Sequence, residues 1–402
     1  MKPLVIVGGV YREICQFPER RDIFGSGGRA AAALAQLNRE VELHCYIPPD
    51  RLAEVAVNFV PFGFRLVSHP CDRLISFRYL HGLASPTPQP ALNTVQSAKT
   101  IELQGDVVLR YGMVEGDAIV RAQRAVYDPQ NPLRPVTFTA NGSSARELAY
   151  VINSSEAALL TGFTDESSQL SWLHTNEKAT VVVLKQGPHG ALASDGTTVT
   201  RIPAFKTEEV WPIGSGDVFS AVFAHFWGAC GYAPEKAAEI ASQSTAYYCD
   251  NSVLPIPASL PQAYPALQLS ASGGPKRRLY LAGPFFTVSQ HWLIDSLRET
   301  FIKLGLEVFS PIHDVGNGSP SKVAKADLAG LEKCDVVFAV CDGLDAGTLV
   351  EVGYAIAKGI PVVAFTQIEQ SDDLTMLIGT GCNVQRDLVT AAYHAVWTAL
   401  ER

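Results

Sequence analysis

The sequence lacks the features that mark membrane proteins and nucleic-acid-binding proteins. No segment approaches the ~20 uninterrupted apolar residues that a membrane-spanning helix requires. Basic residues are not in excess either, because 32 Lys and Arg are outweighed by 40 Asp and Glu, for a formal net charge of −8. Binding to nucleic acid depends on clustered positive charge. We therefore expect neither a membrane nor a nucleic acid as a partner.

The sequence also lacks cysteine motifs and a recognisable leader. Its eight cysteines include no pair with CxxC spacing, and several lie inside apolar runs such as 334–338, so we expect reduced, buried thiols. The first nine residues form an apolar segment that ends in a glycine pair, without the long apolar core and cleavage site of a signal peptide. These features favour a cytoplasmic location.

What the sequence does contain is enough apolar material for more than one hydrophobic core. Its 402 residues are 47% hydrophobic and 18% charged, which is typical of globular proteins. Short apolar runs closed by glycine occur near the start of the chain and again at 279–282, where an α/β domain would place its first strand. Several prolines before residue 276 interrupt helices and central strands. The sequence thus predicts domains at 1–255 and 277–402, joined by a Pro/Gly-rich linker at 256–276.

Both domains are predicted to be α/β. The second alternates strands with longer helical segments, a pattern that favours a doubly wound parallel sheet of the Rossmann or flavodoxin type. Its predicted strands are 279–282, 307–309, 336–340 and 361–365, and its predicted helices are 288–304, 321–333 and 349–358. The first domain is predicted to be mixed α/β, with one strand at 136–139. Doubly wound sheets bind ligands at the carboxyl ends of their strands.

Acidic residues gather after the predicted strand at 336–340. Asp342 and Asp345 follow in the loop, and Glu351 lies on the next helix. Asp345 fits a helix cap, and Asp342, which precedes a glycine, fits a turn. Glu351 fits neither role, because its sequence neighbours are apolar and a buried carboxylate is unfavourable without a partner or a task.

Such a group of carboxylates suits the cleavage of an N-glycosidic bond. The reaction passes through a state that resembles an oxocarbenium ion at the anomeric carbon, which a carboxylate can stabilise or attack. A second carboxyl group in a different environment can protonate the departing base.

Two motifs in the second domain support this chemistry. They are the run from Tyr280 to Phe286 and the run Asp345-x-Gly347-Thr348-x-x-Glu351-x-Gly353-Tyr354-Ala355. Together with Asp335, they make residues 277 to about 380 similar to the nucleoside 2-deoxyribosyltransferases and the related nucleoside 5′-monophosphate N-glycosidases. The resemblance implies that Glu351 is the nucleophile, that Tyr280 orients it, and that Asp335 contacts or protonates the base. It implies further substrate-binding residues: Asp345, Gly283, Phe285, Phe286, His313, Gly347 and Thr348. For His313, a surface turn is an equally good interpretation.

The same resemblance bears on the substrate and on assembly. Asp345 would face the 5′ position of the sugar, where a carboxylate accepts a hydrogen bond from a hydroxyl but repels a phosphate, so a nucleoside is favoured over a nucleotide. The transferases contribute an Asn to the neighbouring subunit's site, which implies a homodimer or larger homo-oligomer. The corresponding segment, 374–376, contains no Asn, so transfer to another base and hydrolysis both stay open. No cofactor is implied for this domain.

The first domain contains a glycine-rich turn, Gly214-Ser215-Gly216, which opens an apolar helix at Asp217. Backbone N–H groups at a helix start bind anions. Three companions accompany the turn, namely the glycine-rich 25–28, the segment from Asn153 to Glu156, and the loop from Lys185 through Gly187 to 190. In this order, residues 1 to about 255 resemble the ribokinase-like (PfkB) sugar and nucleoside kinases.

This second resemblance implies roles in phosphoryl transfer. Asp217 would deprotonate the acceptor hydroxyl, and Gly214, Ser215 and Gly216 would form the anion hole. Asn153 and Glu156 would organise Mg²⁺ and phosphate, and the loop with Lys185 and Gly187 would lie near the nucleotide. ATP and Mg²⁺ are therefore the expected cofactors if this domain is active.

The sequence departs from the kinase pattern at the acceptor end. The usual Asp-Thr pair before the anion hole is replaced by residues 211–212, and the sugar-binding Asn is replaced within 29–33. The early Asp that binds sugar hydroxyls corresponds at best to Glu13. Either the acceptor is unusual or the domain is a degenerate scaffold.

The sequence therefore predicts a two-domain enzyme of nucleoside salvage or breakdown. It would cleave the N-glycosidic bond of a nucleoside or deoxynucleoside and transfer the sugar to another base or to water, beside a sugar or nucleoside kinase domain. One alternative is a pyrimidine nucleoside 5′-monophosphate N-glycosidase with an inactive or regulatory kinase-like domain. The other alternative is a nucleotide-binding regulator without catalytic activity.

Overall fold

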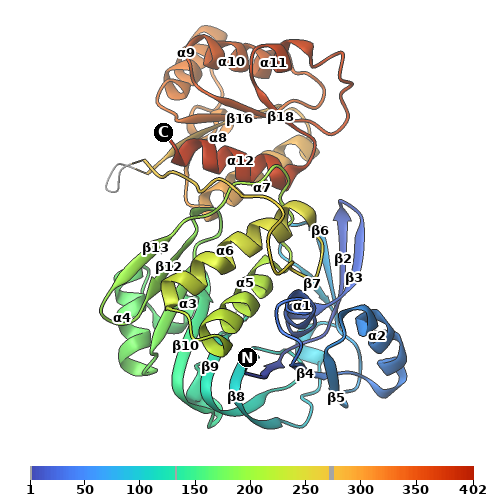
Figure 1. Ribbon diagram of the computed structural model, residues 1–402. Helices are drawn as coiled ribbons and strands as arrows, with labels where there is room; N and C mark the ends of the chain where they lie inside the picture. Colours follow the sequence, from blue (N-terminus) through green and yellow to red (C-terminus); the bar gives the residue numbers. More distant parts are fainter. Residues whose placement is uncertain (1, 132–133, 271–275) are drawn as a thin grey trace. The chain divides into compact units, whose positions relative to one another are not determined.

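The computed structural model describes residues 2–131, 134–270 and 276–402, and the chain divides into two compact units (Figure 1). Unit 1 is Met1–Ala266 and unit 2 is Leu267–Arg402. The division falls inside the predicted linker at 256–276, of which residues 271–275 lie outside the described residues. The first part of that stretch belongs to unit 1, because Ile256 is buried and its amide donates to the Ala33 carbonyl.

Unit 1 is built on a nine-stranded sheet. Its strands are, in sheet order, β13 (Val199–Ile202), β12 (Ala191–Ser194), β11 (Val181–Lys185), β10 (Ser144–Asn153), β9 (Ala118–Asp128), β8 (Ile101–Tyr111), β1 (Leu4–Val7), β4 (Val41–Tyr46) and β5 (Arg65–His69). The pairs from β11 to β5 are parallel, and β12 and β13 are antiparallel to their neighbours. A second sheet contains β3 (Arg20–Ile23), β2 (Arg12–Phe17), β6 (Ser76–His81) and β7 (Thr87–Gln89).

Helices cover both faces of the nine-stranded sheet, because alternate residues of its strands are apolar on either side. Val183 packs into one core with α1 (Gly25–Ala33), α5 (Ser215–Phe223) and α6 (Pro234–Asn251), which Figure 1 shows on one face. Its neighbours Val182 and Leu184 pack into a second core with α3 (Ser154–Thr161) and α4 (Glu166–Asn176). The remaining helical elements are α2 (Leu52–Phe59), the short 3-10 helices Pro49–Arg51, Val60–Phe62, Leu92–Thr94, Phe138–Asn141 and Gly187–His189, and a π-helix at Ala224–Ala229.

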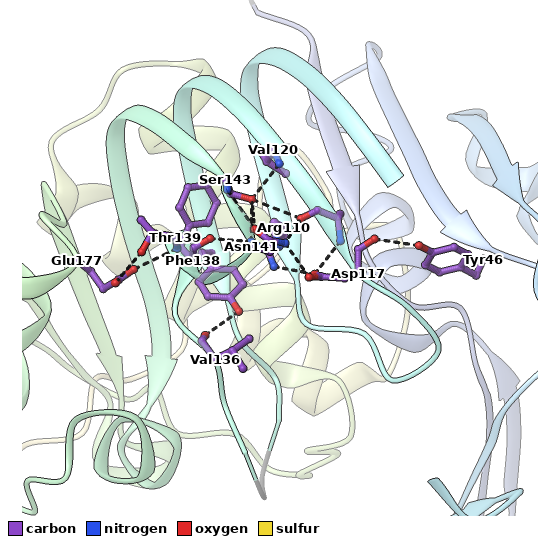
Figure 2. A network of polar contacts seen from close by, with 12 residues as sticks. Tyr46, Arg110, Asp117, Val120, Val136, Phe138, Thr139, Asn141, Ser143 and Glu177 are labelled. Atoms are coloured by element: carbon purple, nitrogen blue, oxygen red, sulfur yellow. Dashed lines mark hydrogen bonds and ion pairs between the residues drawn. The ribbon is translucent and has the colours of Figure 1, made fainter. Parts of the chain in front are cut away.

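The strand predicted at 136–139 is wrong, because Phe138–Asn141 form a 3-10 helix. Side chains bind the backbone donors that a strand would offer to its neighbour: Phe138 N donates to the Tyr150 hydroxyl at 2.7 Å, and Thr139 donates to Glu177. Figure 2 shows Phe138, Thr139 and Glu177 in one polar network with Arg110, whose guanidinium is buried. That guanidinium donates to the Phe138 carbonyl at 3.0 Å, which fixes the turn against β8.

Unit 2 is built on one five-stranded parallel sheet. Its strands are, in sheet order, β15 (Glu307–Phe309), β14 (Arg278–Ala282), β16 (Val336–Val340), β17 (Val362–Phe365) and β18 (Asn383–Gln385). In chain order this is 2-1-3-4-5, the order of flavodoxin-like doubly wound folds. Figure 1 shows α7 (Val288–Lys303) and α12 (Leu388–Leu400) on one face, and α9 (Pro320–Leu331), α10 (Ala346–Ala357) and α11 (Thr375–Gly379) on the other; α8 (Pro311–Asp314) follows β15. The α/β class and the doubly wound second sheet are thereby confirmed.

Two further observations bear on the expectations from composition. The eight cysteines all lie in the described part of the chain and form no disulfide there, and four of them are buried. Within the described stretches of the chain, no helix has both the length and the apolarity to cross a membrane.

We predict that the Tyr150 hydroxyl stabilises unit 1. It donates to Glu177 Oε2 at 2.7 Å and accepts from Phe138 N, so Tyr150→Phe leaves a buried amide without a partner. We expect this change to lower the free energy of unfolding by about 1–3 kcal/mol, measured by chemical denaturation. The matched control is Tyr127→Phe, which loses only a bond to the Val136 carbonyl near the surface. Equal losses for the two variants would contradict this account.

Candidate functional site

Glu351 meets Tyr280 between α10 and β14. Glu351 lies in the second turn of α10, on the side that also carries the buried Val352 and Ala355. Tyr280 is fully buried in β14, where its ring stacks on Phe309 with centroids 5.5 Å apart. Its hydroxyl donates to Glu351 Oε1 at 2.6 Å. The structure therefore brings these two predicted residues together.

The surroundings of Glu351 favour its protonated form. The pKa of Glu351 is raised to about 7, chiefly by burial and also by the negative charges of Asp327 and Asp345, while the Tyr280 hydrogen bond lowers it in part. The pKa of Tyr280 is raised by burial and by Glu351, so its hydroxyl stays a donor. Glu351 can thus exchange a proton near neutral pH, as groups in active sites often do.

A third acidic residue of this cluster, Asp327, was not identified from the sequence. It lies on α9, it is buried, and its Oδ1 has no hydrogen-bond partner among the described residues. Burial raises the pKa of Asp327, and its charge acts on both Tyr280 and Glu351. One signal in the sequence was available: Asp327 lies between an alanine and a leucine on a predicted helix, as Glu351 lies among apolar residues.

Asp335 does not join this cluster, and its expected role at the base is corrected. It directly precedes β16, and its Oδ2 accepts a hydrogen bond from the Arg278 amide at 2.7 Å. Its Oδ1 lies 3.7 Å from Arg277 Nη1. A residue that starts a parallel strand lies at the amino-terminal edge of the sheet, opposite to the edge that binds ligands.

The loop between β16 and α10 is held by its own acidic residues. Asp345 caps α10: its Oδ2 accepts from Thr348 N at 2.8 Å and from Thr348 Oγ1 at 3.0 Å. Gly347 lies beside this cap, since a Cβ there would approach Asp345 Oδ2 to 3.1 Å. Asp342 turns away from α10 and accepts from Thr366 Oγ1 and Gln367 N, both at 2.7 Å. Asp345 therefore stays near Glu351, whereas Asp342 fixes the loop after β17.

The remaining expected substrate-binding residues of unit 2 follow the carboxyl ends of β14 and β15. A Cβ on Gly283 would lie 2.8 Å from Ile294 and 3.1 Å from Val340, so a larger residue would push α7 off the sheet. Phe285 is half-buried, and Phe286 is 71% exposed with its ring 5.5 Å from that of Phe285. His313 lies on α8, partly exposed, 3.0 Å from both Ser310 Oγ and Asp295 Oδ1.

In unit 1, the predicted anion-binding turn opens α5. Gly214 has a φ of 80°, which glycine adopts most readily, and Ser215 and Gly216 begin the helix. Asp217 is buried in the first turn, where Arg29 Nη1 donates to its Oδ2 at 2.9 Å. The turn and the carboxylate thus lie together, and the carboxylate is bound by a cation.

The other predicted kinase residues are bonded to neighbours within unit 1 or lie in a short helix. Asn153 and Glu156 form a capping box at the start of α3, so each side chain accepts a hydrogen bond from the backbone of the other. Lys185 Nζ lies 2.5 Å from Asp128 Oδ2, and Gly187 starts a 3-10 helix. The pKa of Glu156 is raised to about 7, chiefly by burial and also by the negative charge of Asp128. Among the described residues, no group of three or more His, Cys, Asp or Glu could hold a metal ion.

Two family models match parts of the chain. Residues 279–385 match the model described as nucleoside 2-deoxyribosyltransferase, and residues 122–251 match that of the pfkB family carbohydrate kinases. A domain like the deoxyribosyltransferases and a ribokinase-like domain are therefore both present. No curated protein matches the sequence.

Several solved structures are similar to this chain. A pyrophosphate-dependent kinase in the ribokinase family, complexed with a pyrophosphate analog and myo-inositol, is 16% identical with a TM-score of 0.46, over 64% of this chain and 97% of that one. A putative ribokinase from Agrobacterium tumefaciens is 18% identical with a TM-score of 0.46, over 62% and 91%. A fructokinase from Vibrio cholerae O395, with fructose, ADP and calcium bound, is 12% identical with a TM-score of 0.45, over 62% and 94%.

We predict that the charge of Glu351 destabilises unit 2 at alkaline pH. Because burial raises its pKa to about 7, the folded state binds the proton more tightly than the unfolded chain does. Tighter proton binding by Glu351 stabilises the folded state. This stabilisation is fully present below the pKa of Glu351 in the unfolded chain, about 4.3, and is lost as the pH rises through its pKa in the folded state. We expect Glu351→Gln to raise the melting temperature by several degrees at pH 8 and by much less at pH 5. Equal shifts at both pH values would show that the carboxyl group is not buried.

Proposed function

We propose that unit 2 cleaves the N-glycosidic bond of a nucleoside, with Glu351 as the nucleophile. The observation that carries the proposal is the 2.6 Å hydrogen bond from the buried Tyr280 hydroxyl to Glu351, beside a second buried carboxyl group on Asp327. The match of residues 279–385 to the nucleoside 2-deoxyribosyltransferase model supports the same chemistry. The proposal is therefore supported by two independent observations, the hydrogen bond between Tyr280 and Glu351 and the match to the family model.

The reaction proceeds in two steps. The Glu351 carboxylate attacks C1′ as the C1′–N bond breaks, and the departing base takes the bonding electrons together with a proton from Asp327. In the second step, water or another base attacks C1′, Asp327 takes up the proton, and the Glu351 carboxylate is released. Tyr280 holds the carboxylate oxygen in place through its hydrogen bond.

Asp345 selects the substrate in this proposal. Its carboxylate caps α10 and lies close enough to Glu351 to raise the pKa of that residue. A free 5′-hydroxyl can donate to such a carboxylate, whereas a 5′-phosphate is repelled. A nucleoside is therefore the proposed substrate rather than a nucleoside 5′-monophosphate.

The segment 374–376 bears on the acceptor and on assembly. Leu374 is buried and Thr375 begins α11, so no Asn from this segment is offered to a neighbouring subunit. We propose a homo-oligomer whose subunits complete the 5′ side of the site with other residues. The cysteines form no disulfide in the described part of the chain, which supports a cytoplasmic location, where thiols stay reduced.

We predict that Glu351→Ala abolishes release of free base. Purified full-length protein is incubated with single nucleosides and nucleoside 5′-monophosphates, with and without a second base, and the bases are separated by chromatography. Loss of the nucleophile is expected to slow release by on the order of 10³-fold or more. The matched control is Asp335→Asn, which removes a carboxylate from the opposite edge of the same sheet and should keep the rate.

The outcomes of this assay separate the alternatives. Cleavage by Glu351→Ala at the wild-type rate would refute the assignment of the nucleophile. Cleavage of 5′-monophosphates but not of nucleosides would contradict the role of Asp345. Binding of nucleotides without any release of base would point to a regulator. A new nucleoside that forms only with the second base present would show transfer, and free sugar would show hydrolysis.

We predict that Tyr280 sets the acid limb of the pH profile. Cleavage requires ionised Glu351, so kcat/KM should rise with pH through about 7, the pKa of that carboxyl group. Tyr280→Phe removes the hydrogen bond that lowers the pKa of Glu351, so the acid limb should move to higher pH. Activity measured from about pH 5 to about pH 9, on both sides of the pKa of Glu351, tests this. An acid limb that stays in place, or moves to lower pH, would contradict it.

A further inference from the structure

Arg29 is a fully buried cation at the centre of unit 1. It lies on α1, and only 1% of its surface is exposed. Its Nη1 donates to Asp217 Oδ2 at 2.9 Å and to Glu13 Oε1 at 3.1 Å, and its Nη2 donates to Glu13 Oε2. One guanidinium therefore bridges two buried carboxylates that the sequence places 204 positions apart, at 13 and 217. We call Arg29, Glu13 and Asp217 the ion triad.

The guanidinium lies directly on the glycine-rich turn. A Cβ built on Gly214 would come within 2.2 Å of Arg29 Nε and 2.3 Å of its Cζ. The Phe24 ring covers the guanidinium from another side, with its centroid 5.4 Å from Cζ. The space between the turn and Glu13 is thus filled by a side chain of the protein.

Both oxygens of Asp217 are occupied. Oδ2 accepts from Arg29, and Oδ1 accepts from the Gln130 side-chain amide. A general base must lie within hydrogen-bond reach of the proton that it removes. An acceptor hydroxyl would have to share an oxygen of Asp217 with one of these donors, in space that the Arg29 side chain already fills. Displacing Arg29 would leave a buried guanidinium with a single partner, which is strongly unfavourable.

The lysine near the turn is occupied as well. Lys185 Nζ lies 3.5 Å from the position of a Cβ on Gly216, where a phosphate at the helix start would need a cation. It is paired with Asp128 at 2.5 Å, and Ser220 Oγ donates to the same carboxylate oxygen at 2.7 Å. Asp128 is fully buried, so this pair is part of the core of unit 1.

We propose that Arg29 is a built-in occupant of the acceptor position and that unit 1 does not phosphorylate sugar or nucleoside hydroxyls. In this account Asp217 is a structural ion-pair partner rather than a catalytic base. The ion triad joins three elements, since Glu13 lies on β2 of the four-stranded sheet, Arg29 on α1 and Asp217 on α5. The proposal concerns unit 1 and is independent of the glycosidic-bond cleavage proposed for unit 2.

The first test measures phosphoryl transfer by the full-length wild-type protein. ATP, GTP or inorganic pyrophosphate with Mg²⁺ is supplied together with pentoses, hexoses, inositols and nucleosides, and phosphorylated products are followed by ³¹P NMR. We expect no product above that of Asp217→Asn, which serves as the matched control. Turnover that this substitution abolishes would overturn the proposal.

The second test asks whether the triad is a structural unit, and it needs no knowledge of an acceptor. Arg29→Met, Asp217→Asn and the double variant form a cycle in chemical denaturation. We expect each single change to destabilise unit 1 and the two effects to be coupled by about tenfold in the unfolding equilibrium constant. Purely additive effects, or a stabilising Asp217→Asn, would overturn the structural role.

Chemical rescue supplies a third measurement. Millimolar guanidinium should raise the melting temperature of Arg29→Ala by refilling the position between the two carboxylates, relative to sodium chloride at the same ionic strength. Wild type, in which the position is filled, should show no rise. If neither Arg29→Met nor Arg29→Ala folds, Arg29→Lys and Glu13→Gln take the place of the Arg29 variant in the denaturation cycle. Guanidinium that fails to act selectively on the alanine variant would argue against the triad.

Discussion

The chemistry proposed for unit 2 depends on one constraint: a carboxyl group must be kept half-buried on α10 without a cation to neutralise it. The hydrogen bond from Tyr280 is the partial compensation that makes this tolerable. It requires β14 and α10 to approach closely, and the small Gly283 at the end of β14 lets α7 pack just as closely on the other side. The close packing of α10 and α7 on β14 therefore also sets the proton affinity of Glu351.

Unit 1 resolves the same problem in the opposite way. Its buried carboxylates, Asp217 and Glu13, share a guanidinium, and Asp128 is paired with a lysine. A carboxylate whose charge is matched inside the protein stabilises the fold only when all its partners are present, and it has little capacity left for substrate. The two units thus differ in the partner of their buried carboxyl groups. In unit 2 the partner is a neutral hydroxyl, which leaves the carboxyl group reactive, and in unit 1 the partner is a cation, which gives the carboxylate a structural role.

The sequence predicted the fold more fully than the site. Alternation of strands and helices was enough to predict the doubly wound sheet, and a charge among apolar residues was enough to single out Glu351. Asp335 was misplaced because its motif was read without its position on the strand, although a residue that precedes a parallel strand must lie at the amino-terminal edge. Asp327 was missed because it belongs to neither of the two motifs, and its burial depends on how α9 packs in the fold. The contact between Arg29 and Asp217 depends on tertiary packing between helices far apart in the chain, which no local pattern records.

The ion triad also has a consequence for motion. Because Glu13 belongs to the four-stranded sheet while its partners belong to helices on the nine-stranded sheet, the smaller sheet is tied to the larger one through a buried charge network. A hinge between them would have to expose that network to water or leave it unbalanced. The two sheets should therefore exchange their amide hydrogens as one cooperative unit, with the small sheet as protected as the core beneath it.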